Sequence, residues 1–174
     1  MNTEQQPMYE WNTLPWRTIE RSVFKLQKRI YQASQNNDRV LVHKLQRLLI
    51  SSWSAKCLAV RRVTQDNQGK KTAGVDGIKS LSPQQRMRLV QTLRVDVKTR
   101  PVRRVWIPKP HAPTEKRGLG IPTLFNRAAQ MLLKLALEPE WEAKFEPNSY
   151  GFRPGRSCHD AIDAIYSSIN QKPK

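Results

Sequence analysis

Basic side chains crowd one segment of the sequence. Between Arg94 and Arg117 there are eight Lys and Arg residues, and only Asp96 and Glu115 oppose them. Arginine can hold two phosphate oxygens in a fork, whereas lysine acts as a mobile point charge. The segment is therefore predicted to grip a polyphosphate or a nucleic-acid backbone. The alternative is a hydrated hairpin edge whose charge only prevents aggregation.

A second segment, Tyr150–Arg156, interleaves aromatic residues, glycines and arginines. Aromatic rings can stack on bases, and glycines let a backbone approach a strand closely. The same composition is equally typical of a loop that anchors itself on the protein core. The residues alone leave both interpretations open.

No constellation of residues predicts catalysis. The segment Gly69–Thr72 lacks the GxxxxGK[ST] spacing of a phosphate-binding loop, which excludes an NTPase of that class. The three glutamates beside Pro139, and Asp160 with Asp163 at a helix start, are interpreted as structural. The two cysteines form no CxxC pair, so neither a disulfide framework nor a zinc site is predicted. We expect no metal site and no cofactor in this chain.

The charge balance indicates a polyanionic partner. In 174 residues, 31 Lys and Arg face 14 Asp and Glu, which leaves a net charge of +17. Such a surface repels itself and attracts nucleic acid, which we favour over a membrane surface. No apolar run approaches the roughly 20 residues that a bilayer span needs. We expect a soluble cytoplasmic protein, in a bacterial or organellar interior, with no membrane partner.

Helical periodicity dominates the first third of the chain. Apolar residues from Trp16 to Ile30 recur at steps of three and four, which predicts an amphipathic helix with a basic outer face. A second helical pattern runs from Leu41 to Val60, and the two would form a helical hairpin. Three glycines and several turn formers then make a regular element over Gln65–Gly77 unexpected.

The remaining elements predict one β-hairpin among helices. Ser82 caps a helix, and Val102–Ile107 pairs with Gly118–Pro122 across a long proline-rich loop. Thr123 opens a hydrophobic helix that Pro139 should kink or end. A last helix after Ser157 has an apolar inner face formed by Ala161, Ile162, Ile165 and Ile169. The fold class is therefore mostly α with a β-hairpin (α+β).

Four motifs, taken together, carry a family resemblance. Gly74–Gly77, Pro101–Lys109, Arg117–Thr123 and Asn148–Ser157 follow one another in the order found in group II intron-encoded reverse transcriptases, also called maturases. The resemblance covers roughly residue 16 to the end. It implies an RNA-binding N-terminal helical extension over residues 1–64, a Gly-rich template lid over 65–80, and part of the fingers of a right-hand RNA-directed DNA polymerase over 81–174.

The resemblance also implies roles for single residues. Lys109 and Arg117 match the residues that hold the triphosphate of the incoming nucleotide. The remaining implied or candidate contacts to RNA and template are Arg17, Arg21, Lys25, Lys28, Lys70, Lys71, Arg103, Arg104, Arg153 and Arg156. The sequence departs from the family pattern at Gly118 and in the irregular approach from Leu93 to Pro101.

The catalytic aspartates of the family are not in this sequence, and neither are its palm and thumb. Nucleotidyl transfer needs carboxylates that hold two magnesium ions, so Mg²⁺ is expected for a complete enzyme and polymerase activity is not expected of this chain alone. The expected partners are structured intron RNA and template-primer. Three alternatives stay open: one subunit of a split reverse transcriptase completed by a palm- and thumb-containing polypeptide, a stand-alone basic RNA-binding remnant, or a decayed fragment without function.

Overall fold

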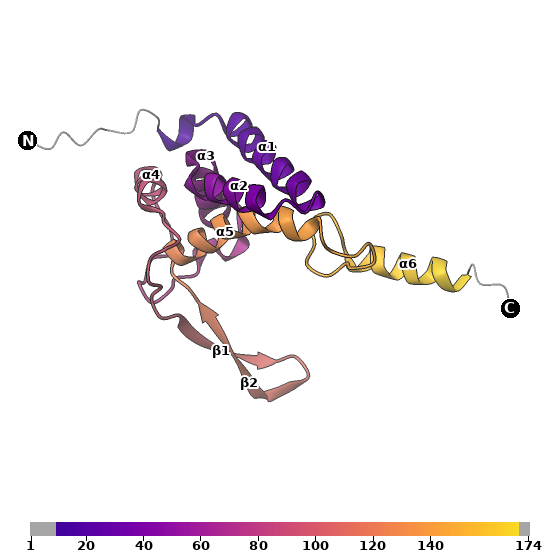
Figure 1. Cartoon of the computed structure of the whole chain (residues 1–174). Coiled ribbons are helices and arrows are strands. Elements are labelled where there is room, and N and C mark those ends of the chain that lie inside the picture. The colour runs from indigo at the N-terminus through magenta and orange to yellow at the C-terminus, as the bar shows by residue number, and fades with distance from the viewer. Residues whose placement is uncertain (1–9, 171–174) are drawn as a thin grey trace, which may run out of the picture.

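A computed structural model describes residues 10–170, except for the side chains of Gln68 and Lys70. Figure 1 shows a helical body from which a β-hairpin projects and beyond which the last helix extends. The elements in chain order are α1 (Trp16–Gln35), α2 (Arg39–Ser51), α3 (Trp53–Arg61), α4 (Pro83–Thr92), β1 (Arg103–Lys109), β2 (Ala112–Ile121), α5 (Leu124–Glu142) and α6 (Cys158–Asn170). The prediction of a mostly helical fold with one β-hairpin is confirmed.

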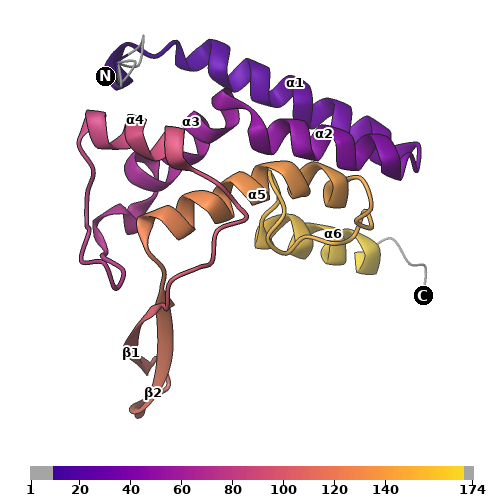
Figure 2. The same cartoon turned by 60° about the vertical axis from the view of Figure 1, so that its left-hand side comes forward.

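The core lies where α5 packs against α1, α2 and α3, with α4 covering the far side of α3 (Figure 2). One buried cluster joins Val23 and Ile30 of α1, Leu49 of α2 and Leu132 and Leu135 of α5. This cluster crosses the boundary expected at residues 65–80. The two regions on either side of that boundary therefore pack as one body.

Helix α1 agrees with the sequence pattern. Ile19, Val23 and Ile30 are buried, and Trp16 and Leu26 pack partly buried against the same cluster. The basic side of the helix is exposed. Its amphipathic character follows from the spacing of the apolar residues, which places them on one face.

The single helix expected from Leu41 to Val60 is wrong. The chain breaks at Ser52, whose backbone is extended (φ −64°, ψ 127°), and the break separates α2 from α3. Leu48 and Trp53, on the expected stripe, are 50% and 40% exposed. Both of the short helices on either side of the break pack on α5.

The segment after α3 holds more regular structure than expected. Residues 62–66 form a π-helical turn, closed by the Asn67 N–H donating to the Arg62 carbonyl, and residues 68–71 form a 3-10 turn. The Thr64 hydroxyl donates to the Val60 carbonyl at 2.8 Å. A segment rich in turn-forming residues can still form a single π-helical or 3-10 turn, although it does not favour a longer helix.

The hairpin is longer and its turn tighter than expected. β1 and β2 pair antiparallel from Arg103 opposite Ile121 to Pro108 opposite Lys116, and after a register shift Lys109 pairs with Ala112. The prediction of a long proline-rich loop between the two strands is therefore wrong. In a two-stranded ribbon many N–H groups face outward, so proline can occupy those positions without losing a ladder hydrogen bond.

Helix α5 runs through Pro139 to Glu142. The expected end at Pro139 is wrong, and another helix supplies a donor to the carbonyl that Pro139 leaves without one. Pro139 cannot donate to the Leu135 carbonyl, and the Gln27 Nε2 of α1 donates to it instead at 2.9 Å. A side chain from α1 thus satisfies a backbone group of α5.

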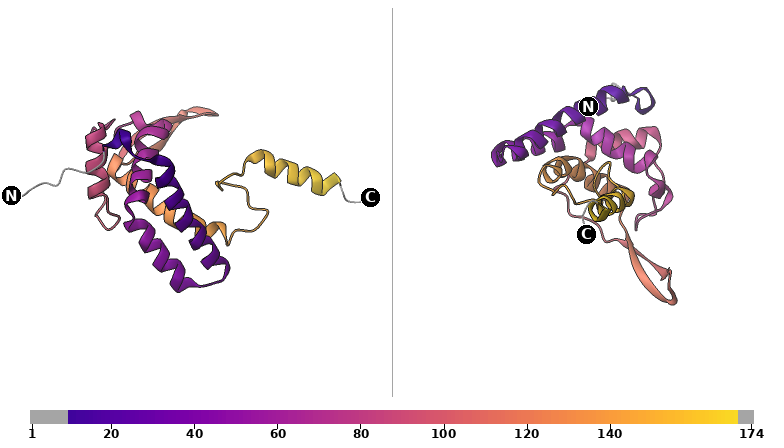
Figure 3. Two further views of the ribbon diagram at one scale, coloured as in Figure 1. Left: turned by 90° about the horizontal axis from the view of Figure 1, so that it is seen from above. Right: turned by 90° about the vertical axis from the view of Figure 1, so that its right-hand side faces the viewer.

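Helix α6 begins as expected and packs differently from the expectation. The Ser157 N–H donates to the Asp160 carboxylate at 2.6 Å, which caps the first turn. No residue of α6 is buried, and Ile162, Ile165 and Ile169 are 59%, 60% and 71% exposed. Figure 3 shows α6 standing away from the helical body. The prediction that these isoleucines form an inner face is therefore wrong for the described residues, because no other described element covers them.

Candidate nucleic-acid interface

The hairpin presents its cations to solvent. Arg103, Arg104, Lys109 and Arg117 are all exposed on strands that project from the body. At the root, the Arg103 guanidinium donates to the Ala73 carbonyl at 3.4 Å, a long hydrogen bond. An exposed ribbon rich in Lys and Arg can approach a phosphate backbone without steric interference from the helices.

The two residues expected to hold a triphosphate lie toward the distal part of the hairpin. Arg117 pairs opposite Ile107 on the neighbouring strand. Lys109 forms an ion pair with Glu115, and their side chains are 49% and 60% exposed. An exposed ion pair contributes little to stability, so a phosphate group can replace Glu115 at low cost. The triphosphate role of both residues stays a prediction.

The loop expected to cover the template is fastened to the start of α5. A Cβ atom built at Gly74 would lie 2.8 Å from the Thr123 Cα, so only glycine allows this approach. The Arg127 guanidinium donates to the carbonyls of Gly69 and Pro122 at 3.0 Å each, and also to that of Thr72.

Arg127 was not among the residues expected to matter. The sequence did contain a signal for it: Arg127 is the one cation in the mostly apolar first two turns of α5. Burial lowers the pKa of its guanidinium, and Asp76 opposes that shift. Of the two lysines expected on the loop, Lys71 is exposed and the Lys70 side chain lies outside the described part.

A basic stripe runs along the exposed side of α1. Its members are Arg17, Arg21, Lys25 and Lys28. Steps of four, four and three place them on one side of the helix. Within residues 10–170, none of the four takes part in an ion pair. The stripe is therefore open to an external anion.

Arg153 is a buried anchor of its own loop. Its guanidinium donates to the Glu142 carboxylate, with Nη2 2.6 Å from Oε1, and to the carbonyls of Glu146 and Ser149 at 2.8 Å. The hydrogen bond from Arg153 holds the pKa of the Glu142 carboxyl below its ordinary value. These hydrogen bonds favour the anchoring interpretation of the loop over a template contact at Arg153.

Arg156 and Phe152 complete the same loop. The Arg156 guanidinium donates to the Pro147 carbonyl at 2.5 Å and lies 5.3 Å from the centre of the Tyr150 ring. Phe152 has a φ of +60° and is fully exposed. The loop thus holds Phe152 outward on an anchored backbone, and Arg156 is only half-exposed.

The carboxylates of the described chain are largely engaged with cations or helix caps. Glu140 pairs with Lys144, Asp96 pairs with Arg94, and Asp38 accepts from the Leu41 N–H at 2.9 Å. Within residues 10–170, no three His, Cys, Asp or Glu side chains gather as metal ligands. The donors present do not fit the two-magnesium arrangement that nucleotidyl transfer uses.

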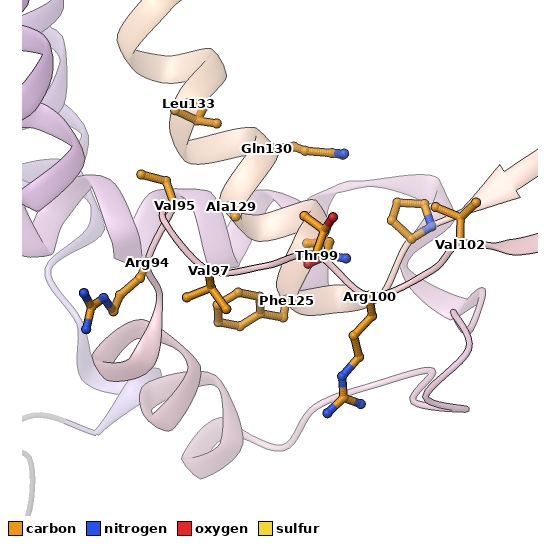
Figure 4. Close-up of a pocket in the computed structure, with 12 residues that line it drawn as sticks. Arg94, Val95, Val97, Thr99, Arg100, Val102, Phe125, Ala129, Gln130 and Leu133 are labelled. Carbon is orange, nitrogen blue, oxygen red and sulfur yellow. The ribbon is translucent and has the colours of Figure 1, made fainter.

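A cavity of about 170 Å³ opens at the root of the hairpin, between the segment 94–102 and α5 (Figure 4). Its apolar wall includes Val97, Val102 and Phe125, and Arg100 and Asn126 are among its polar lining residues. The irregular approach to the hairpin that departs from the family pattern therefore forms one wall of a cavity.

The comparisons with known proteins identify the class. Residues 11–93 match the family model described as the N-terminal domain of reverse transcriptase, a stretch that runs from the residues before α1 to the end of α4. The part of the helical body formed by α1 to α4 is therefore similar to the N-terminal domain of reverse transcriptases.

Among the relatives of known sequence are proteins named as maturase-like or as encoded by a group II intron. The chain is 34% identical over 150 residues to protein YkfC of Escherichia coli, covering 82% of this chain and 38% of that protein. It is 34% identical over 165 residues to maturase-like protein 1 of Euglena gracilis, covering 89% and 34%. It is 36% identical over 102 residues to the group II intron-encoded protein LtrA of Lactococcus lactis, covering 57% and 17%.

The chain belongs to the group II intron reverse transcriptases and maturases, and it corresponds to their N-terminal part. It spans about a third of the length of the first two relatives. The family resemblance of the four motifs is thus confirmed. Within residues 10–170, no helix is both long and apolar enough to cross a bilayer.

Proposed function

We propose that this chain is the RNA-binding and fingers portion of a group II intron reverse transcriptase or maturase, which acts in intron splicing and retrohoming. The observation that carries the proposal is the exposed, largely unopposed positive charge on α1 and on the hairpin of a chain from this family. The partners are structured intron RNA and the template-primer. A relative is itself named as encoded by a group II intron.

The two basic surfaces suit different parts of that task. The α1 stripe is a row of cations on a rigid helix, which fits the backbone of a folded RNA. The hairpin is a narrow projecting ribbon, which fits a groove or a nucleotide held between protein parts. On this basis Lys109 and Arg117 bind the triphosphate of the incoming nucleotide, and the loop fastened by Arg127 covers the template.

Nucleotidyl transfer is assigned to groups outside the described residues. Among the described residues, carboxylates such as Glu115 and Glu142 neutralise cations, and no three His, Cys, Asp or Glu side chains gather as a site for magnesium. In a complete enzyme, magnesium would activate the primer end and stabilise the leaving oxygens. This chain then supplies binding and positioning, with no polymerase activity alone.

The uncovered face of α6 suits contact with palm and thumb, whether these belong to the same polypeptide or, in the split-enzyme alternative, to a second one. Ile162, Ile165 and Ile169 lie on one helical side and remain exposed, and such a helix gains most of its stability when a surface covers its apolar side. A polypeptide that supplies palm and thumb would cover it. Ile165→Asp should then abolish co-purification with that polypeptide. Ser167→Asp, on another side of α6, should not, and equal co-purification of both variants would rule out this interface.

The RNA-binding proposal is tested on the α1 stripe. Neutralising Arg17, Arg21, Lys25 and Lys28 together to Gln should weaken binding of a group II intron RNA and flatten its salt dependence. The log–log slope should fall by roughly 0.7–0.9 for each phosphate that is no longer neutralised. Ser22→Ala in the same helix is the matched control and should bind as the wild type does. An unaltered slope in the fourfold variant would count against an RNA-facing α1.

A further inference from the structure

The hairpin has two unlike faces. Successive side chains of a strand point to opposite sides, so Arg104 and Trp106 share one side. Their partners on β2 are Gly120 and Gly118. A Cβ built at Gly118 would lie 3.4 Å from the Arg104 Cδ and 3.5 Å from the Trp106 Cζ3, so both side chains lie across the glycine strand.

We call this side the glycine-backed face: Val102, Arg104 and Trp106 over Gly118 and Gly120. Val102 belongs to it because its Cγ2 would lie 3.1 Å from a Cβ at Gly120. Arg117 pairs with Ile107 and therefore points to the other side. The glycine-backed face is thus distinct from the face that carries Arg117.

Trp106 is an exposed aromatic ring beside positive charge. It is 58% exposed, and the Arg104 guanidinium carbon lies 5.9 Å from its ring centre. Lys116 pairs with Pro108 and points to the same side. Glycines beneath a ring leave its outer side open, and an open ring flanked by cations matches the way single-stranded nucleic acid is bound.

The glycine-backed face continues into the cavity at the hairpin root, because Val102 lines both. The Asn126 side chain in this cavity is only 7% exposed, and among the described residues no hydrogen bond to its amide group is found. The cavity of about 170 Å³ is several times the roughly 30 Å³ that one water occupies. An amide that has no hydrogen-bond partner among the described residues suits the edge of a base.

We infer that the glycine-backed face and the root cavity bind single-stranded RNA. One base stacks on Trp106, a neighbouring base enters the cavity against Phe125 and hydrogen-bonds to the Asn126 amide, and Arg104 and Arg100 contact phosphates of the same stretch of strand. Charge complementarity favours RNA as the occupant, since Asp96 and Glu115, the two acids between residues 94 and 117, pair with Arg94 and Lys109. The inference rests on the RNA-binding part of the proposed function and names where and how bases are held.

Binding of a fluorescein-labelled oligouridine of about twelve nucleotides, followed by anisotropy, tests the inference. Removing the ring beneath one stacked base costs about 1–3 kcal/mol, so Trp106→Ala should weaken binding about 5- to 150-fold. Trp106→Phe should recover most of the affinity. Leu119→Ala is the matched control, because Leu119 is 48% exposed and lies opposite Val105 on the other face.

The salt dependence separates stacking from charge. Trp106→Ala should leave the log–log slope unchanged, whereas Arg104→Ala should reduce it by roughly 0.7 for one phosphate of a single strand. Trp106 is exposed and lies outside the buried core, as does Arg104, so Trp106→Ala and Arg104→Ala should keep the melting temperature of the wild type. Asn126→Asp should weaken binding through its added negative charge at the base edge.

The outcomes distinguish this inference from the proposed function. Wild-type affinity of Trp106→Ala for oligouridine, or an equal loss of affinity in Leu119→Ala, would overturn the stacking site. If intron RNA still bound through the α1 stripe in that case, the proposed function would stand. If neither oligouridine nor intron RNA bound the wild-type chain, the proposed function itself would fail.

Discussion

The hydrogen bond from Gln27 to the Leu135 carbonyl predicts a measurable coupling between α1 and α5. Gln27→Leu removes the donor and leaves a carbonyl without its partner beside Pro139, which cannot supply an N–H. Pro139→Ala restores an N–H in the position that a regular helix uses. Gln27 should therefore matter in the wild-type chain and matter much less in the Pro139→Ala background.

The magnitude follows from the environment of the bond. Leu135 is fully buried and the bond is part-buried, so an unsatisfied carbonyl should cost about 1–2 kcal/mol, toward the lower end of the usual range. For a protein of this size, 1 kcal/mol shifts the melting temperature by about 2–4 °C. Gln27→Leu should thus lower the melting temperature by about 2–8 °C, and by much less when Pro139 is alanine.

The assay is a double-mutant cycle by thermal or urea unfolding, since a cycle isolates the pairwise coupling. Gln32→Leu, an exposed position on the same helix, is the matched control and should change stability little. Additive effects of the Gln27 and Pro139 substitutions would refute the reasoning. An equal loss of stability in the control variant would also refute it.

Three further predictions follow from the site. The Glu142 carboxyl has a lowered pKa when folded, so its stabilising contribution is present above pH 4.5 and lost as the pH falls through the folded value. The protection of amides in the loop after α5, measured relative to their intrinsic exchange rates at each pH, should therefore fall in acid, and protection that does not change with pH would contradict this. Gly74→Ala should lower the melting temperature more than Gly69→Ala, because only the former meets backbone, and equal shifts would contradict the close approach. Changing Lys109 and Arg117 to Ala should raise the KM for deoxynucleotides in an enzyme reconstituted with palm and thumb, and unchanged kinetics would remove their triphosphate role.

Local signals in the sequence predicted local structure well. The apolar stripe of α1 and the Ser82 capping box both depend on residues within one or two helical turns, and both agree with the structure. The same local reasoning missed the break at Ser52. The spacing of apolar residues continues across Ser52, whereas the break goes with the packing of both α2 and α3 on α5. It also missed the continuation of α5, because the donor for Leu135 comes from Gln27, far away in sequence.

The candidate site was predictable as a composition and less so as a geometry. Charge density identified the hairpin and α1, whose cations are exposed. Charge alone does not say which way a guanidinium turns, and Arg153 turns inward to Glu142. Amphipathicity likewise predicted an apolar side of α6 without showing what covers it. Trp106 was not singled out, although its alternation with Arg104 opposite two glycines is visible once the hairpin register is known.

The most direct test of the central claim is the equilibrium affinity of the purified 174-residue chain for a group II intron RNA at roughly 50 and 200 mM salt. If exposed cations hold the RNA backbone through about six to ten phosphates, as we propose, the affinity should fall by about 10³- to 10⁵-fold over that range. An affinity that does not change with salt, or no binding at the lower salt concentration, would contradict the account.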